Sequence, residues 1–164
     1  MLKHNSQRGY FAYALWQEMK KNKDIMILTG DLGYGMLDQI QKDFPNRFIN
    51  VGASEQSLLD IGVGLALSGK IPVCYSITPF LLYRALETIR NYINHEKTPV
   101  ILVGSGRDKD YTHDGFSHWA EEDKKIMGIF GNIKSYWPET KEDVARLTKE
   151  VIKGKAPVYI NLRR

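Results

Sequence analysis

Glu55 is the residue of this sequence whose type and position are best suited to chemistry. It lies on the first turn of a helix predicted within the run 50–69, with Ser54 placed to cap the helix and Gly69 to end it. The apolar stripe that predicts this helix consists of Leu58, Ile61 and Leu65. A carboxylate in this position can exchange a proton with a ligand, and it also complements the helix dipole by about 0.3–1 kcal/mol.

Five further residues could form a site with Glu55. Asp31 lies in a Gly-Asp-Leu turn, which by itself is also typical of a structural turn aspartate. Phe80 and Tyr83 have the i, i+3 spacing of one helix face, which suits either a buried core or stacking on a flat ring. Asp114 and His118 share a polar loop, and a histidine is suited to proton transfer near neutral pH.

Three arginines are candidates for binding an anionic substrate: Arg8, Arg107 and Arg164. A guanidinium can bind phosphate with two hydrogen bonds. Each of the three, taken alone, also fits a solvated surface charge. The histidines show no pair with metal-ligand spacing, so the sequence predicts no metal site in this chain.

Helical and strand-like segments alternate along the chain, which is typical of a parallel sheet covered by helices. Strands are predicted at 25–28, 48–51, 72–77, 100–103, 133–136 and 158–162. Helices are predicted at 8–22, 36–44, from Glu55 to the turn at Gly69, from Thr78 to about Asn94, in a short stretch after 117, and at 139–152. We expect one doubly wound α/β domain over residues 1–164, with a mainly parallel sheet of about six strands.

Apart from Arg8, the candidate residues all follow predicted strands. Ligands bind at the carboxyl ends of the strands in such a sheet, so the strand pattern alone supports a site there.

Several residues carry packing predictions. Gly62 and Gly64 each cost the helix roughly 1 kcal/mol relative to alanine, which predicts close approach of a second helix or subunit. Thr78 is predicted to cap the helix that Pro79 opens. Cys74, the only cysteine, is expected to be a small buried apolar residue.

Composition limits the class of protein. The chain has 164 residues, 43% hydrophobic and 26% charged, and a net charge of +4 from 23 basic and 19 acidic residues. The basic residues are mostly scattered, so a nucleic-acid partner is not indicated. No apolar segment approaches the length of a membrane span, and the polar start does not resemble a signal peptide. Together with the single cysteine, these features predict a cytoplasmic protein.

The segment around Glu55 resembles a known family. Residues 52–56 read Gly-Ala-Ser-Glu-Gln, and residues 64–69 read Gly-Leu-Ala-Leu-Ser-Gly. This is similar to the pyrimidine-binding domain of transketolase-type thiamine diphosphate enzymes, where Gly-Ile-Ala-Glu-Gln precedes a Gly-Leu-Ala helix. The family's glutamate hydrogen-bonds N1′ of the cofactor's aminopyrimidine. The resemblance therefore implies that Glu55 is catalytic and binds the cofactor, and that the fold is the thiamine diphosphate-binding fold.

The resemblance also implies roles for the other candidates. Asp31 would lie against the cofactor, and Phe80 and Tyr83 would line the pyrimidine pocket. Asp114 and His118 match an Asp-Gly-Pro-Thr-His turn whose aspartate and histidine contact substrate hydroxyls, and His118 would assist proton transfer.

Among the arginines, Arg8 and Arg164 match phosphate-binding positions of transketolases. Arg107 resembles an arginine of deoxyxylulose-phosphate synthases. Gly35 stands where some transketolases have a serine that contacts phosphate, which predicts an acceptor other than an ordinary pentose phosphate.

The Gly-Asp-Gly and asparagine motif of the family's diphosphate-binding domain is not found in this sequence. We therefore expect a single pyrimidine-binding domain, with the diphosphate-binding and C-terminal domains absent. A separate partner chain would carry Mg²⁺ and share the cofactor. Two copies of each chain would form an α2β2-like assembly, with self-association through the helix of Glu55.

The resemblance implies a subunit of a split transketolase-like enzyme that transfers a two-carbon ketol unit between sugars through thiamine diphosphate, and the sugars are expected to be phosphorylated. Within the same chemistry, the alternatives are a deoxyxylulose-phosphate-synthase-like subunit and the beta subunit of a 2-oxo-acid dehydrogenase. An alternative of another class is a non-catalytic binding or regulatory module that has kept only the fold.

Overall fold

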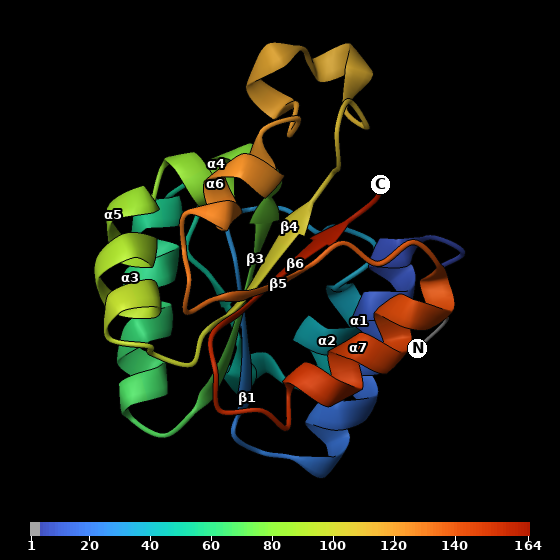
Figure 1. The fold of residues 1–164 in the computed structure, drawn as a ribbon. Coiled ribbons are helices and arrows are strands. Elements are labelled where there is room, and N and C mark those ends of the chain that lie inside the picture. Colours follow the sequence, from blue (N-terminus) through green and yellow to red (C-terminus); the bar gives the residue numbers. More distant parts are fainter. Residues whose placement is uncertain (1–3) are drawn as a thin grey trace.

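The computed structural model describes residues 4–164 and shows one six-stranded sheet in which every pair of neighbouring strands is parallel (Figure 1). The strand order is β2-β1-β3-β4-β6-β5. The strands are β1 (Ile25–Thr29), β2 (Phe48–Asn50), β3 (Ile71–Ile77), β4 (Ile101–Ser105), β5 (Lys134–Tyr136) and β6 (Val158–Leu162). The predicted parallel α/β sheet is thereby confirmed.

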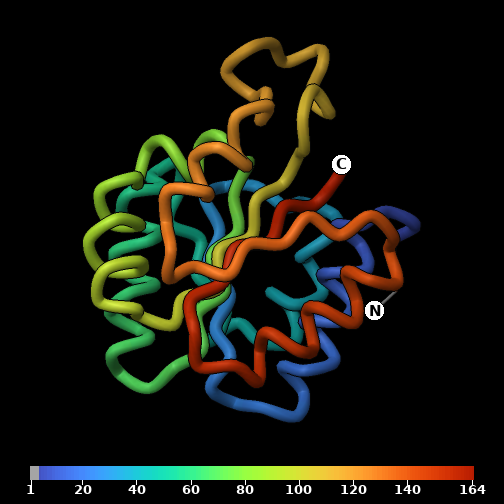
Figure 2. Tube along the Cα trace, viewed as in Figure 1, coloured from blue at the N-terminus to red at the C-terminus, as the bar shows by residue number. Residues whose placement is uncertain are grey.

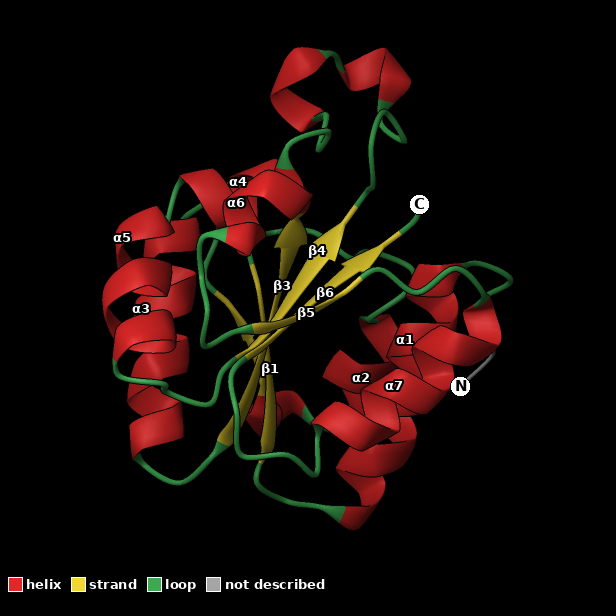
Figure 3. Cartoon of the chain, viewed as in Figure 1, coloured by secondary structure: helices red, strands yellow, loops and turns green. Residues whose placement is uncertain are grey.

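Helices cover both faces of the sheet, as Figures 1 and 3 show. One layer consists of α1 (Gln7–Lys21), α2 (Asp38–Asp43) and α7 (Lys141–Val151). The other consists of α3 (Glu55–Leu67), α4 (Thr78–Tyr83), α5 (Leu86–Thr88), the π-helix η2 (Ile89–His95) and α6 (Asp123–Gly128). None of the helices within residues 4–164 is long and apolar enough to cross a membrane.

Alternation along the central strands divides the core into two apolar clusters. On β3, Val73 and Tyr75 pack into the cluster beneath α1 and α7, whereas Cys74 packs into the cluster beneath α3 and α4. Successive side chains of a strand point to opposite faces, so a strand covered on both sides has to be apolar throughout. This explains why the predicted strands are short continuous apolar runs.

The chain leaves the sheet after β4 and returns to it at α6. This excursion, residues 106–122, carries two short 3₁₀ turns, η3 (Thr112–Asp114) and η4 (Phe116–His118). Figure 2 shows it as the yellow to orange segment that projects beyond the carboxyl ends of the strands. A third such turn, η1 (Pro45–Arg47), precedes β2.

Two predicted helix caps differ from the structure. Ser54 occupies the cap position of α3, but its hydroxyl donates to the Ser57 hydroxyl and makes no capping bond. Thr78 is already inside α4, whose cap is Ile77, and its hydroxyl donates to the Gly106 carbonyl at 2.7 Å. The Thr78 side chain thus fixes the start of the 106–122 excursion.

The helix predicted from Thr78 to about Asn94 is interrupted. Ala85 leaves helical geometry between α4 and α5, and the chain then continues as the π-helix η2. Beyond the break, the Thr88 hydroxyl donates to Asp60 at 2.6 Å, which fixes α5 against α3. The predicted end of α3 is confirmed, because Gly69 follows it with a φ of +80°.

The two glycines inside α3 have different environments. A Cβ at Gly62 would lie 2.6 Å from the Cys74 sulfur, so Gly62 allows α3 to pack on β3 within this chain. At Gly64 a Cβ would meet nothing within 4 Å, and the position is exposed. The prediction that both glycines serve contact with another helix or subunit is therefore wrong for Gly62.

We predict that Gly62→Ala lowers the free energy of unfolding by about 1–3 kcal/mol, because the added methyl group overpacks the core against Cys74. Gly64→Ala is the matched control, and it should raise the free energy of unfolding by up to about 1 kcal/mol through helix propensity. Urea unfolding followed by circular dichroism measures both. Equal effects of the two substitutions would contradict the packing argument.

Candidate functional site

Glu55 is the most buried carboxylate at the carboxyl edge of the sheet. Its side chain is 1% exposed, at the first turn of α3. Oε1 accepts a hydrogen bond from the Ser76 hydroxyl of β3 at 3.1 Å, and Oε2 accepts one from the Arg84 guanidinium at 2.7 Å. A buried carboxylate is costly unless it is paired and hydrogen-bonded, and these two contacts meet that requirement.

Arg84 belongs to the site, although the sequence alone does not single it out. It follows α4 directly, its side chain is 47% exposed, and the centre of its guanidinium lies 3.8 Å from the centroid of the Phe80 ring. The signal that could have found it is its i, i+4 spacing from Phe80, which places a cation and an aromatic ring on one helix face.

Aromatic rings connect α4 to the 106–122 excursion. The rings of Phe80 and His118 meet edge to face, with centroids 4.8 Å apart. The centroid of the Tyr111 ring lies 5.9 Å from that of the His118 ring. The His118 Nδ1 is 2.9 Å from the Ser117 hydroxyl. The structure thus brings together Glu55, Phe80 and His118 through Arg84 and ring contacts, as expected of one site.

Tyr83 points away from this contact toward α6. Its hydroxyl donates to Glu122 at 3.1 Å, and its side chain is 44% exposed. Partial burial, together with the charge of Glu122, raises the pKa of Tyr83 to about 12, so the phenol stays protonated at physiological pH.

Asp31 lies at the end of β1 in left-handed geometry, with a φ of +58°. Its carboxylate accepts hydrogen bonds from the Tyr34 hydroxyl and from the Asn50 side chain of β2, and its backbone N–H donates to Asn50 Oδ1. The Tyr34 bond, and to a lesser degree the Asn50 bond, lower the pKa of Asp31. Asp31 is therefore an exposed, ionised carboxylate held in one orientation.

Asp114 and Arg164 lie near each other at the outer rim of the site. Asp114 is exposed in η3, and the Arg164 guanidinium is 3.8 Å from its carboxylate and 4.7 Å from the centroid of the Tyr111 ring. The ion pair is long and solvated, so both groups remain open to a ligand.

Arg107 does not have the geometry of a phosphate-binding arginine. Its side chain is 2% exposed. Its guanidinium donates to Asn161 Oδ1, to the Asn161 and Pro138 carbonyls, and to Glu139. All three guanidinium nitrogens are thus used inside the protein, which does not support the prediction that Arg107 binds an anionic substrate.

Arg8 lines a small hollow of about 360 Å³ next to the end of β1. Tyr34 and Gly35 share this hollow. The Arg8 Nε is buried and has no hydrogen-bond partner within residues 4–164, although the guanidinium also contacts the Tyr75 hydroxyl. Arg8 therefore retains hydrogen-bonding capacity facing the region where Asp31 lies.

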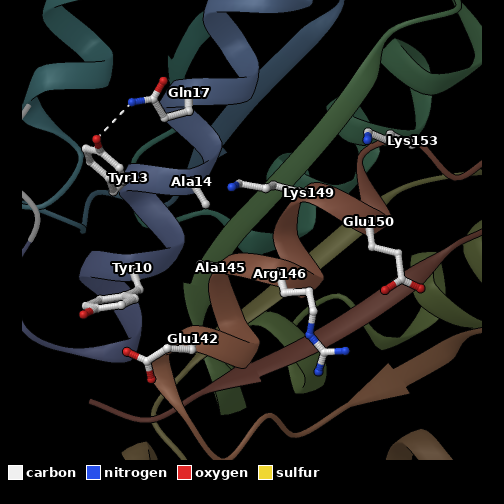
Figure 4. A pocket seen from close by; sticks show the side chains of 10 residues that line it. All are labelled: Tyr10, Tyr13, Ala14, Gln17, Glu142, Ala145, Arg146, Lys149, Glu150 and Lys153. Carbon is white, nitrogen blue, oxygen red and sulfur yellow. Dashed lines mark hydrogen bonds between the residues drawn. The ribbon is translucent and has the colours of Figure 1, made fainter.

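A larger hollow lies away from this edge. It is an open groove of about 790 Å³ between the outer faces of α1 and α7, bordered by Tyr10, Tyr13, Arg146 and Lys149 among others (Figure 4). Gln17 donates to the Tyr13 hydroxyl there at 3.0 Å. None of the predicted site residues borders this groove, and we assign no chemistry to it.

Across residues 4–164, no group of three or more histidine, cysteine, aspartate and glutamate side chains is arranged to hold a metal ion.

Comparison with known proteins gives a consistent result. A family model described as the pyrimidine-binding domain of transketolase matches residues 5–164. A subunit of the apulose-4-phosphate transketolase of Actinobacillus succinogenes is 36% identical over 121 residues, which are 74% of this chain and 39% of that protein. The transketolase subunit for 6-deoxy-6-sulfo-D-fructose of a Clostridium species is 27% identical over 96% of this chain and 49% of that protein.

Among solved structures, a split-gene transketolase in an inactive β4 tetramer matches with a TM-score of 0.86 and 31% identity. The match covers 97% of this chain and 51% of that one. The chain thus spans about half, or less, of the length of these relatives.

We predict that Tyr34→Phe raises the pKa of Asp31 toward its ordinary value, because the strongest hydrogen bond to the ionised carboxylate is lost. Carbon-detected NMR titration of the aspartate carboxyls measures the shift, and Tyr92→Phe, an exposed tyrosine of η2, is the control.

A lowered pKa in the folded state stabilises the fold above the unfolded pKa, and this stabilisation is lost as the pH falls through the folded pKa. Tyr34→Phe should therefore be less stable than the native chain near neutral pH, and the difference should vanish in acid. An unchanged Asp31 titration would show that the Tyr34 bond does not orient this carboxylate.

Proposed function

The chain belongs to the family of transketolase pyrimidine-binding domains, and on that basis we propose that it is the pyrimidine-side subunit of a split, thiamine diphosphate-dependent transketolase-like enzyme. The observation that carries the proposal is the position of Glu55. A carboxylate that is 1% exposed lies at the carboxyl edge of a parallel sheet, connected through Arg84 to an aromatic ring, in a chain that matches this family over residues 5–164.

The residues present fit the aminopyrimidine half of the cofactor. A flat heteroaromatic ring needs a ring face to stack on and a polar partner for its nitrogen. Phe80 offers the face, and Glu55 offers the polar partner, which Ser76 holds through the other carboxylate oxygen. Asp31 adds a fixed acceptor at the neighbouring strand end.

Thiamine diphosphate, when bound, supplies the carbon nucleophile that carries a two-carbon ketol unit. Glu55 would share a proton with N1′ of the aminopyrimidine and so control the proton state of that ring. His118, next to Phe80, would exchange protons with a substrate hydroxyl, and Asp114 would accept a hydrogen bond from another. Tyr83, a neutral phenol, would close the side of the pocket toward α6.

Anion binding is proposed for Arg8 and Arg164, which lie on two sides of the edge. Arg8 has a buried Nε without a partner in residues 4–164, and the Arg164 guanidinium has a long ion pair to Asp114 and a ring contact with Tyr111. Both therefore keep donors for a sugar phosphate. The two relatives named above act, by their names, on a sugar phosphate and on a sulfonated sugar, and both substrates carry an anionic group.

We propose that a separate partner chain supplies the site for the diphosphate and Mg²⁺. We also propose that the chain described here pairs with a second copy of itself through α3. Two features support self-association. The outward face of α3 presents Gly64 between Ile61 and Leu67, which are 39% and 75% exposed. The related split-gene transketolase forms a tetramer of one chain that is inactive, as expected if activity requires a second kind of chain.

The deoxyxylulose-phosphate-synthase-like alternative is less favoured, since Arg107, the residue that suggested it, is buried and its guanidinium bonds within the protein. A non-catalytic module is disfavoured because Glu55, Asp114 and His118 are all retained and lie at one edge of the sheet. Ketol transfer between sugars therefore remains the best-supported activity.

We predict that Glu55→Gln, assayed with the partner chain, lowers ketol transfer by at least about a hundredfold, because an amide cannot exchange the proton that N1′ requires. Glu87→Gln, which changes an exposed carboxylate of α5, is the control and should retain activity. Circular dichroism and thermal unfolding check that both variants are folded. Transfer within about tenfold of the native chain would rule out the proposed role of Glu55.

We predict that the purified chain binds thiamine diphosphate and Mg²⁺ only weakly by calorimetry, since the partners of the diphosphate charge lie on another chain. Tight stoichiometric cofactor binding together with turnover by this chain alone would refute the split assembly.

We predict that Gly64→Leu weakens self-association of the chain, measured by sedimentation velocity. Gly128→Leu, at an exposed glycine of α6, is the control and should leave self-association unchanged.

A further inference from the structure

Arg84 makes the two contacts that the aminopyrimidine would need. Its guanidinium is a flat, delocalised group that lies 3.8 Å from the centroid of the Phe80 ring, and its NH1 donates to Glu55 Oε2 at 2.7 Å. The other oxygen of Glu55 already accepts from Ser76. A second flat ring that stacks on the same face of Phe80 and bonds the same carboxylate oxygen therefore competes directly with Arg84.

We propose that Arg84 is a place-holder for the aminopyrimidine: it occupies the ring's position in the cofactor-free chain and leaves Phe80 and Glu55 when the cofactor binds. This inference rests on the proposed function and adds to it a residue that sets cofactor affinity. Arg84 touches the groups that bind the cofactor, whereas its own role is to be displaced.

The environment of Arg84 allows it to leave. Its side chain is 47% exposed, and within residues 4–164 its guanidinium hydrogen-bonds only to Glu55. Arg107 is the contrasting case, because it is 2% exposed and its guanidinium donates four hydrogen bonds within the protein. Release of Arg84 to water costs one ion pair and one ring contact, while the backbone of α4 can stay in place.

Replacement of the Arg84 guanidinium by the aminopyrimidine also changes the number of protons bound at the site. Arg84 brings a positive charge to the buried carboxylate, but the aminopyrimidine arrives neutral, and its N1′ is a hydrogen-bond acceptor like the carboxylate itself. One proton must therefore enter between Glu55 and N1′ when the ring replaces the guanidinium. Because Arg84 carries its own charge into the solvent, this proton comes from the solvent, and binding should take up about one proton.

Binding of an isolated aminopyrimidine tests the competition without the partner chain. The probe is 4-amino-5-hydroxymethyl-2-methylpyrimidine, followed by ligand-observed NMR with the full chain. Arg84→Met should bind it about tenfold more tightly than the native chain, because the competing occupant is gone. Arg90→Met, which removes an exposed arginine of η2, is the matched control and should not change the affinity.

Arg84→Lys keeps a cation next to Glu55. It is the second test variant, for the case that Arg84→Met does not fold. An ammonium lacks the flat stacking group, so Arg84→Lys should bind the probe with an affinity between those of the native chain and Arg84→Met. Equal or weaker binding by the folded Arg84 variants, in a protein whose native form does bind the probe, overturns the place-holder. Failure of every form to bind contradicts the proposed cofactor site itself.

Proton uptake gives a readout that loss of a merely structural contact would not change. Calorimetry of the probe in buffers of different ionisation enthalpy should show uptake of about one proton by the native chain and clearly less by Arg84→Met, in which no guanidinium is exchanged for the ring. The same uptake by both forms overturns the exchange.

Discussion

The burial of the Glu55 carboxylate constrains the helices and strands around it. Glu55 can stay buried only if each oxygen has a partner, and the fold supplies one from β3 through Ser76 and one from the end of α4 through Arg84. The parallel sheet makes this possible, because β3 and the start of α3 reach the same edge. The buried face of α3, which includes Leu58 and Leu59, then fixes the direction of Glu55 by packing into the core.

A second polar network, centred on Asp123 and Asn161, lies at the carboxyl edge of the sheet near β4 and β6. Asp123 accepts hydrogen bonds from Trp137, Tyr159 and Asn161, and Asn161 in turn accepts from Arg107. These bonds connect α6 and β6 to the start of the 106–122 excursion, which carries His118. Arg107 is therefore important for position and not for anion binding. Buried polar groups that are all satisfied define one geometry, and this network does so for the loop.

The sequence predicts the repeating parts of this structure well, since periodicity and apolar runs are local signals that packing then reinforces. It predicts less well whatever depends on a distant partner. Thr78 looks like a cap, yet it bonds Gly106, and Gly62 looks like an intersubunit contact, yet it faces Cys74 of the same chain. Arg107 could not be distinguished from a surface arginine before the positions of Asn161 and Glu139 were known. Glu55 itself was recognisable because its signal is a local motif.

Without a cofactor or a partner chain, the domain must stabilise its buried carboxylate with its own residues. A neutral donor such as Ser76 satisfies one oxygen but supplies no charge, so the cation has to come from the chain itself. Arg84 meets this need and remains half exposed, which keeps it removable. A fully buried cation of the Arg107 kind would stabilise Glu55 more firmly but would close the site permanently. On the proposed place-holder role, the exposure of Arg84 is a compromise between stabilising Glu55 in the cofactor-free chain and keeping the site open to a ring.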